Sequence, residues 1–198
     1  TANLAAILAG QGNRVAIIDT DIQSPCIHFL FGMDETMVDK SLNDYFWGKC
    51  AITDAAYLVT PEVVRQTGGS IHLVPCSIKA GEIARILNEG YSVVMLNDGL
   101  KQLCQGLNLD YLLIDTHPGL NKETLLSIAI SDGLIIILRP DRQDFQGTAV
   151  TLQVANKLDT PKISLVVNKV LSKFDPAAVK EQISKRFQVP VAGVFPVS

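Results

Sequence analysis

The sequence has 198 residues, 47% of them hydrophobic, and a formal net charge of −3. This length accommodates one domain with a sizeable core, and the acidic balance argues against a globally basic, DNA-coating surface. No apolar run approaches the roughly 20 residues of a membrane-spanning helix, because the longest one, 133–138, has only the length of a strand.

Predicted helices and strands alternate along the whole sequence. A helix covers 2–9 and ends at Gly10 and Gly12, because glycine commonly terminates helices, and a buried strand follows at 15–18. Short helical pieces are expected between Gly32 and Gly48. The remaining strands are expected at 71–75, 111–115, 134–138, 163–168 and 191–195, and the remaining helices at about 80–89, 96–107, 122–131, 145–158 and 176–187.

Most of these strands are continuous apolar runs, which is typical of a parallel sheet that helices cover on both faces. We therefore expect an α/β fold in which residues 1–198 form a single three-layer α/β/α domain with a mostly parallel central sheet. In such sheets, ligands bind beyond the carboxyl ends of the strands. The ends of three strands carry the informative residues.

Two acidic residues follow the strand at 15–18. Asp19 and Asp21 alternate at its carboxyl end. A buried carboxylate is costly unless it is paired or bound to a cation, and the end of a strand is where a ligand's phosphates and Mg²⁺ would lie. Asp-x-Asp is a common pattern by itself, so a simple helix cap is the plainer alternative.

A more specific pattern ends the strand at 111–115, where Asp115 is followed by Thr, His, Pro118 and Gly119. An apolar strand that ends in Asp is similar to a Walker B strand, whose Asp holds Mg²⁺ directly or through water. Gly119 permits the backbone freedom that a loop sensing a γ-phosphate needs. A capped turn without any ligand is the alternative here.

Asn168 ends the strand at 163–168. Its amide offers both a donor and an acceptor, which suits the N6/N7 edge of adenine. Asparagine also ends strands simply because it tolerates turns. The apolar residues Val194, Phe195 and Pro196, at the end of the last strand, would supply a wall for a base.

Two further patterns point to no particular chemistry. The cysteines form no C-x-x-C pair, so metal ligation and a redox motif are not favoured, and free thiols in a reducing cytosol are expected. The basic residues within 157–186 fit solvated helix faces better than a contact patch for DNA or an acidic partner. The cysteines are Cys26, Cys50, Cys76 and Cys104.

Together these patterns resemble the ParA/MinD family of deviant-Walker P-loop ATPases, which have a SIMIBI-type NTPase fold. The likeness covers nearly the whole sequence, in order. Residues 1–8 resemble the helix after the phosphate loop, 19–21 resemble switch I, and 115–121 resemble switch II. Asn168 and Pro196 stand where the family contacts adenine.

The resemblance implies Mg²⁺-dependent ATP hydrolysis within a homodimer that forms in the ATP state. Asp21 would position or polarise the attacking water, Asp115 would organise the Mg²⁺ shell, and Asp19 would support it. Backbone groups around Pro118 and Gly119 would sense the γ-phosphate. Phosphoryl transfer depends mostly on positioning and electrostatics, so these residues suffice without covalent chemistry.

The resemblance also implies a cellular role. Members of the family are switches that position a division site, a plasmid or other cargo, and an activating partner protein is expected. The protein is expected in the cytoplasm, either free or peripheral at a membrane surface or at nonspecific DNA of the nucleoid.

The sequence departs from the family pattern in three places. The Gly- and Lys-rich phosphate loop would precede Thr1, and the family continues beyond Pro196, so we expect truncation at both ends. Since that loop and the helix N-terminus make the anion site, this piece alone is expected hardly to bind ATP. His117 replaces the second residue of the usual Asp-x-Pro-Pro-Gly, either as a tolerated loop substitution or as a pH-sensitive element of switch II.

Three other functional classes remain open. Bacterial tyrosine kinases share the Asp-x-Asp segment but usually carry Arg where this sequence has Gln23. Iron–sulfur scaffold ATPases share it too and carry a C-x-x-C pair near the C-terminus. Residues 1–198 contain no such pair, although the missing tail could hold one. A non-catalytic binding module would use the fold only for dimerisation or docking, although the retained Asp19, Asp21 and Asp115 argue against it.

Overall fold

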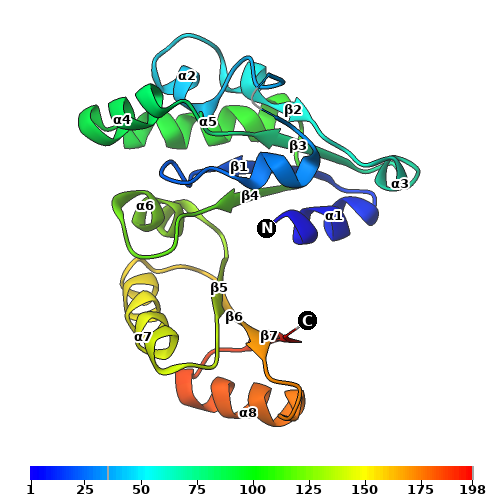
Figure 1. Cartoon of the computed structure of the whole chain (residues 1–198), viewed down its shortest axis with the longest axis vertical. Coiled ribbons are helices and arrows are strands. Elements are labelled where there is room, and N and C mark those ends of the chain that lie inside the picture. Colours follow the sequence, from blue (N-terminus) through cyan, green and yellow to red (C-terminus); the bar gives the residue numbers. More distant parts are fainter. Residues whose placement is uncertain (35, 198) are drawn as a thin grey trace. The chain divides into compact units, whose positions relative to one another are not determined.

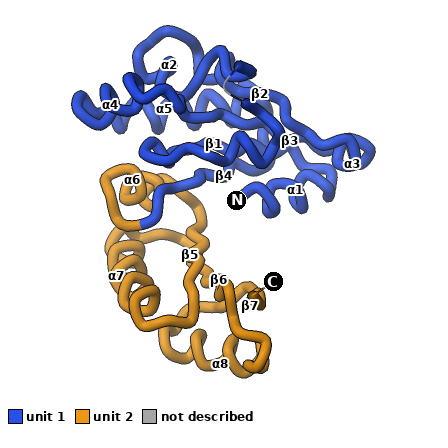
Figure 2. Tube along the Cα trace, viewed as in Figure 1, with its two compact units in different colours: residues 1–118 blue, residues 119–198 orange. Residues whose placement is uncertain are grey.

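The computed structural model describes residues 1–34 and 36–197, which form two compact units, 1–118 and 119–198 (Figure 2). The expectation of a single domain over 1–198 stays a prediction. Among the described residues, no helix combines the length and the apolar character that crossing a bilayer requires.

The first unit contains a four-stranded sheet with the order β2-β3-β1-β4. Strands β3 and β4 both run parallel to β1, whereas the short edge strand β2 is antiparallel to β3. Figure 1 shows α4 and α5 on one side of this sheet and α1 on the other. The strands are β1 (Arg14–Asp19), β2 (Tyr57–Leu58), β3 (Ser70–Val74) and β4 (Tyr111–Asp115), and the helices are α1 (Ala2–Gly10), η1 (Ile27–Phe31), α2 (Leu42–Phe46), η2 (Ile52–Ala55), α3 (Glu62–Arg65), α4 (Ala80–Glu89) and α5 (Val93–Gly106).

Strand β1 lies at the centre of this unit, and every residue from Val15 to Asp19 is buried. Its apolar side chains pack with those of β3 and with the small face of α1, which contributes Ala5 and Ala9. Gly69 permits this close packing, because a Cβ at that position would lie 1.9 Å from the carbonyl oxygen of Ala9. The result is a rigid base for the loop that follows Asp19.

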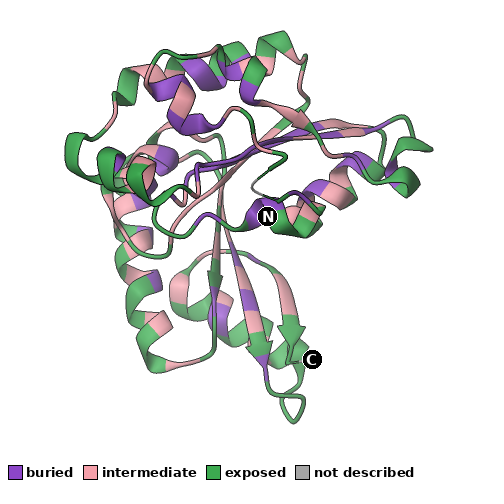
Figure 3. Cartoon of the chain, turned by 45° about the horizontal axis from the view of Figure 1, so that its top comes forward, coloured by how far each residue is buried: buried purple, intermediate pink, exposed green. Residues whose placement is uncertain are grey.

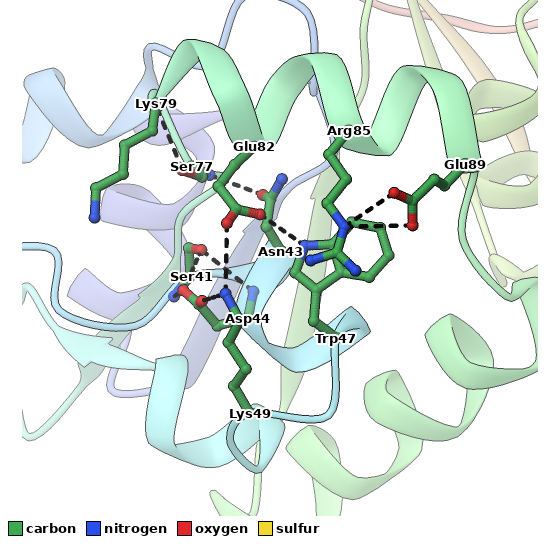
Figure 4. Close-up of polar contacts among 10 residues, drawn as sticks. All are labelled: Ser41, Asn43, Asp44, Trp47, Lys49, Ser77, Lys79, Glu82, Arg85 and Glu89. Atoms are coloured by element: carbon green, nitrogen blue, oxygen red, sulfur yellow. Dashed lines mark hydrogen bonds and ion pairs between the residues drawn. The ribbon is translucent and has the colours of Figure 1, made fainter.

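A polar cluster fastens α4 to α2 on the outer side of this unit (Figure 4). Trp47, just after α2, donates its indole N–H to Glu82 of α4 at 2.7 Å. The guanidinium of Arg85 lies over the Trp47 ring, 3.8 Å from its centroid. Lys49 pairs with both Glu82 and Asp44, so one cation joins the two helices.

The second unit contains the parallel sheet β5-β6-β7, with α6 before it. Helices α7 and α8 pack on one face through Leu152 and Ile183. The other face carries Ile135 and Ile137, which are 50% and 61% exposed because side chains alternate along a strand. Figure 3 shows buried and exposed residues along the chain. The elements are α6 (Lys122–Ile130), β5 (Leu134–Leu138), α7 (Arg142–Lys157), β6 (Ile163–Val170), α8 (Pro176–Phe187) and β7 (Val191–Pro196).

The structure confirms all six expected strands and the order of the expected helices. Helices α5 and α7 begin three residues earlier than their apolar patterns indicate. Ser92 accepts the N–H of Met95, and Asp141 accepts that of Asp144, so polar N-caps set these starts. The sequence reading missed β2 and α3, which are only 2 and 4 residues long.

Candidate active site

The carboxyl ends of β1 and β4 lie side by side and bring two carboxylates together. Asp19 and Asp115 are Cα partners in the parallel register of these strands. Thr20 fixes the following loop, because its backbone N–H and its hydroxyl both donate to the carbonyl oxygen of Asp115, at 2.8 and 2.7 Å. The sequence predicted these two acids at the ends of two separate strands, and the structure places them next to each other.

Asp19 is fully buried. Its Oδ1 accepts the backbone N–H of Asp21 at 2.9 Å, whereas its Oδ2 is buried without a hydrogen-bond partner among the described residues. Burial, together with the neighbouring charges of Asp115 and Asp21, raises the pKa of Asp19 to about 7, although the hydrogen bond from the Asp21 N–H lowers it. A carboxylate in this position gains strongly from a nearby cation.

Asp21 lies in the loop after β1, and its side chain is 17% exposed. Its Oδ1 accepts the backbone N–H of Ser24 at 3.1 Å and lies 2.8 Å from Nδ1 of His117. A carboxylate only accepts, so Nδ1 carries the hydrogen in this contact. His117 therefore joins the loop after β4 to the loop after β1, a relationship that sequence reasoning did not predict.

Thr1 also belongs to this cluster. It precedes α1, and its hydroxyl donates to Oδ1 of Asp115 rather than capping its own helix. The N-terminus of α1 therefore lies at the same strand ends as the carboxylates, and a helix N-terminus attracts anions. Sequence reasoning identified the helix but not Thr1, although a hydroxyl residue directly before a helix start was the available signal.

The chemistry of these side chains fits Mg²⁺. The described residues hold no group of three or more His, Cys, Asp or Glu side chains that could hold a metal ion by themselves. Mg²⁺ usually takes only one or two carboxylates and keeps water or substrate phosphates as its other ligands. Asp115, a nearby hydroxyl and the unpartnered Oδ2 of Asp19 match that mode of binding.

Pro118 and Gly119 follow in the loop before α6. Gly119 has a φ of +104°, a conformation that favours glycine, and no heavy atom lies within 4 Å of where a Cβ would be. Asn121 then caps α6 by accepting the N–H of Thr124 at 2.8 Å. The role of Pro118 and Gly119 toward a γ-phosphate stays a prediction.

Asn168 and Pro196 lie in the second unit, near the carboxyl ends of β6 and β7. Val170 and Pro196 are register partners there, so these strand ends are adjacent. The Oδ1 of Asn168 accepts the N–H of Lys169 at 2.9 Å, in a turn where Lys169 has a φ of +57°. Adenine binding by this pair stays a prediction.

The four cysteines are free thiols, as expected. Cys76 is buried and donates to the carbonyl oxygen of Asp19 at 3.1 Å. Cys26 is exposed, yet desolvation of its thiol and the charges of Asp19, Asp21 and Asp115 raise its pKa, and burial raises the pKa of Cys76 well above its ordinary value. Both thiols therefore favour the protonated form, which is a poor metal ligand.

Comparisons with known proteins identify the family and the fold. A family profile described as an AAA domain matches residues 1–169. The chain belongs to the ParA/MinD family of P-loop ATPases. The septum site-determining protein MinD of Pyrococcus horikoshii, solved in complex with Mg-ADP, has a similar fold, with a TM-score of 0.80 and 20% identity over 98% of this chain and 73% of that one. The fold is thus that of a MinD-like P-loop NTPase, with the expected α/β/α layers.

Two curated relatives of this ParA/MinD chain differ in their described roles. An uncharacterized ATP-binding protein of Methanocaldococcus jannaschii is 31% identical over 99% of the chain. An iron–sulfur cluster carrier protein of Methanococcus maripaludis is 27% identical over 85% of the chain. The chain spans 67% of the first relative and 54% of the second, so it corresponds to only part of their length.

Proposed function

We propose that the protein containing this chain is a Mg²⁺-dependent ATPase that acts as a dimerising molecular switch. One observation carries the proposal. Asp19, Asp21 and Asp115 gather beside Thr1 at the N-terminus of α1, so carboxylates suited to a cation adjoin a helix end suited to phosphate. Membership of the ParA/MinD family of ATPases supports the same reading.

The carboxylates would divide the work between metal and water. Asp115 would hold Mg²⁺, directly or through water, and Asp19 would support that shell through its buried Oδ2. Asp21 would orient the attacking water, since its Oδ1 is fastened by the N–H of Ser24 while its side chain keeps some exposure. Positioning of this kind is the main contribution proteins make to phosphoryl transfer.

The remaining site residues would recognise the nucleotide. Backbone groups at Pro118 and Gly119 would sense the γ-phosphate, because the open conformation of Gly119 leaves room beside the chain. Asn168 and Pro196 would contact adenine.

The switch would serve spatial positioning of a division site, a plasmid or another cargo in the cytoplasm. It would dimerise with ATP bound, associate with a membrane surface or nonspecific DNA, and respond to an activating partner. Co-sedimentation of the full-length protein with anionic liposomes and with DNA, with and without ATP, tests the surface. ATP-dependent pelleting with one of them is expected, and pelleting with neither would refute the positioning role.

A measurement of ATP-dependent dimerisation tests whether the protein acts as a switch. Asp21→Ala should slow hydrolysis while leaving ATP binding intact, so the ATP-bound dimer should accumulate. Size-exclusion chromatography with light scattering, on full-length protein with Mg-ATP, should show more dimer for Asp21→Ala than for the wild type. If the wild type and Asp21→Ala both stay monomeric at saturating Mg-ATP, the proposed switch is contradicted.

Iron–sulfur cluster carriage is a second candidate, favoured by the 27% identity to the Methanococcus maripaludis carrier. The C-x-x-C pair expected of such carriers does not occur within residues 1–198, which span 54% of that relative's length. Anaerobic reconstitution of the full-length protein with ferrous iron and sulfide separates the two. A stoichiometric cluster with its visible absorption would favour the carrier, and its absence alongside ATP-dependent dimerisation would favour the switch.

A further inference from the structure

We propose that His117 is a positioning residue for ATP hydrolysis, which holds the carboxylate of Asp21 in the orientation that aligns the attacking water. This inference rests on the proposed function, because Asp21 has its role only if ATP is hydrolysed. It goes beyond that function by tying the loop after β4 to the catalytic carboxylate of the loop after β1 through one side chain. The contact is the 2.8 Å approach of His117 Nδ1 to Asp21 Oδ1.

The two oxygens of Asp21 differ in their surroundings. Oδ1 is fixed by two donors, the backbone N–H of Ser24 and Nδ1 of His117. In residues 1–34 and 36–197, Oδ2 forms no hydrogen bond, and the side chain is 17% exposed. One oxygen is therefore anchored while the other remains open to a water molecule, which is the arrangement a water-orienting carboxylate needs.

The anchor is needed because Asp21 stands on irregular backbone. Residues 20–26 form neither helix nor strand, so the direction of the Asp21 side chain is not set by a regular element. Ser24 belongs to the same loop, so its N–H does not tie Asp21 to another element. His117 is the donor from outside that loop, and its own backbone follows β4, which is paired with β1 up to Asp115.

The geometry of the two strand ends keeps this contact short. Thr20 donates twice to the carbonyl oxygen of Asp115, so the first residues of both loops are fixed to each other. His117 and Asp21 each lie two residues beyond their strand-terminal Asp, at matching places in the two loops. The bond needs only a hydrogen on Nδ1, so the role requires no change in the charge of His117.

The kinetic consequence is specific. Loss of the His117 donor should lower kcat, because a misplaced carboxylate costs on the order of 10- to 100-fold in rate. The KM for ATP should change little, since His117 contacts Asp21 rather than the groups proposed to bind the base and phosphates. A merely structural role would instead lower the thermal midpoint and affect both constants.

The experiment compares His117→Asn, His117→Gln and His117→Leu in the full-length protein. The Asn amide places a donor where Nδ1 lies, Gln extends its amide past that position, and Leu keeps bulk without a donor. We expect Asn to retain kcat within about 3-fold, and Gln and Leu to lose on the order of 10- to 100-fold, with similar KM values and thermal midpoints. Equal kcat in Leu and wild type, or equal loss in Asn and Leu, would overturn the proposal.

A double-mutant cycle and a spectroscopic measurement distinguish the failure of this proposal from failure of the proposed function. In an Asp21→Ala background, His117→Leu should cause no further loss of kcat, and an undiminished loss would show that His117 acts without Asp21. Nitrogen NMR of the imidazole needs no ATPase activity. Wild type should show the Nδ1–H tautomer and Asp21→Ala should lose that preference, whereas identical spectra would overturn the contact whether or not ATP is hydrolysed.

Discussion

Asp19 and Asp115 are register partners at the carboxyl ends of the parallel strands β1 and β4, so two acidic side chains begin from adjacent backbone positions. Strand pairing rather than chance surface proximity sets their separation. Asp19 is buried and Asp115 is hydrogen-bonded to Thr1, and the two carboxyls therefore have different environments. These environments predict different effects for their substitution.

Asp19→Asn should stabilise the metal-free protein at neutral pH. Folding raises the pKa of Asp19 from 3.8 to about 7, so the folded state holds this proton more tightly and loses stability as pH rises between those values. At roughly 1.4 kcal/mol per pKa unit, the gain is on the order of 2–4 kcal/mol. Urea denaturation with a chelator at about pH 8 should show it, and at about pH 4 it should vanish. A gain of equal size at both pH values would contradict this explanation.

Asp115→Asn should weaken the response to Mg²⁺. If Asp115 organises the metal shell, the Mg²⁺ concentration for half-maximal ATP turnover should rise by on the order of 10-fold or more. Asp110→Asn is the matched control, because Asp110 precedes the same strand at its other end and pairs with Arg14. An unchanged Mg²⁺ requirement in Asp115→Asn, or an equal shift in the control, would remove Asp115 from the metal site.

Gly69→Ala should destabilise the first unit. A methyl group there would lie 1.9 Å from the carbonyl oxygen of Ala9, so α1 or β3 must shift, at a cost of about 1–3 kcal/mol or more. Gly147→Ala in α7 is the control, since nothing lies within 4 Å of its Cβ position and alanine favours helix. Thermal denaturation should rank Gly69→Ala below wild type and Gly147→Ala at or above it. The reverse order would show that α1 does not pack as described.

The fold was largely predictable from sequence because its strands are strong signals. The run at 15–18 is apolar throughout, since β1 is buried between two neighbouring strands, and Asp141 marks a helix start by its capping chemistry. Strand β2 was missed because 2 residues carry no period, and its place depends on pairing with β3 far along the chain.

The candidate site was predictable in its residue types but not in its contacts. Asp19, Asp21 and Asp115 were identified as strand-end acids, yet the bond between His117 and Asp21 joins residues 96 positions apart. No local pattern encodes such a contact, because it depends on which strands are neighbours. The protonation of Asp19 likewise follows from burial, which only the folded structure determines.

Glu82→Ala should loosen the attachment of α4 to α2. Glu82 accepts the indole N–H of Trp47 and pairs with Lys49, so its loss removes these two contacts and leaves the stacking of Arg85 on the Trp47 ring. Trp47 is the single tryptophan of the chain, and its fluorescence should shift to the red as its environment becomes wetter. Hydrogen exchange in 80–89 should accelerate while β1 stays protected. Glu62→Ala, which removes a surface pair with Arg65, is the control, and identical exchange in both variants would contradict the role of Glu82.

The most direct test is phosphate release from Mg-ATP by the full-length protein, comparing wild type with Asp21→Ala and with Asp34→Asn. Asp34 accepts hydrogen bonds from the N–H and the hydroxyl of Thr36 in its own turn. It therefore serves as an acidic control that does not belong to the proposed active site. We expect measurable Mg²⁺-dependent turnover in wild type and Asp34→Asn, and a loss on the order of 100-fold or more in Asp21→Ala. Wild-type turnover no higher than that of Asp21→Ala would contradict the ATPase and leave a binding module.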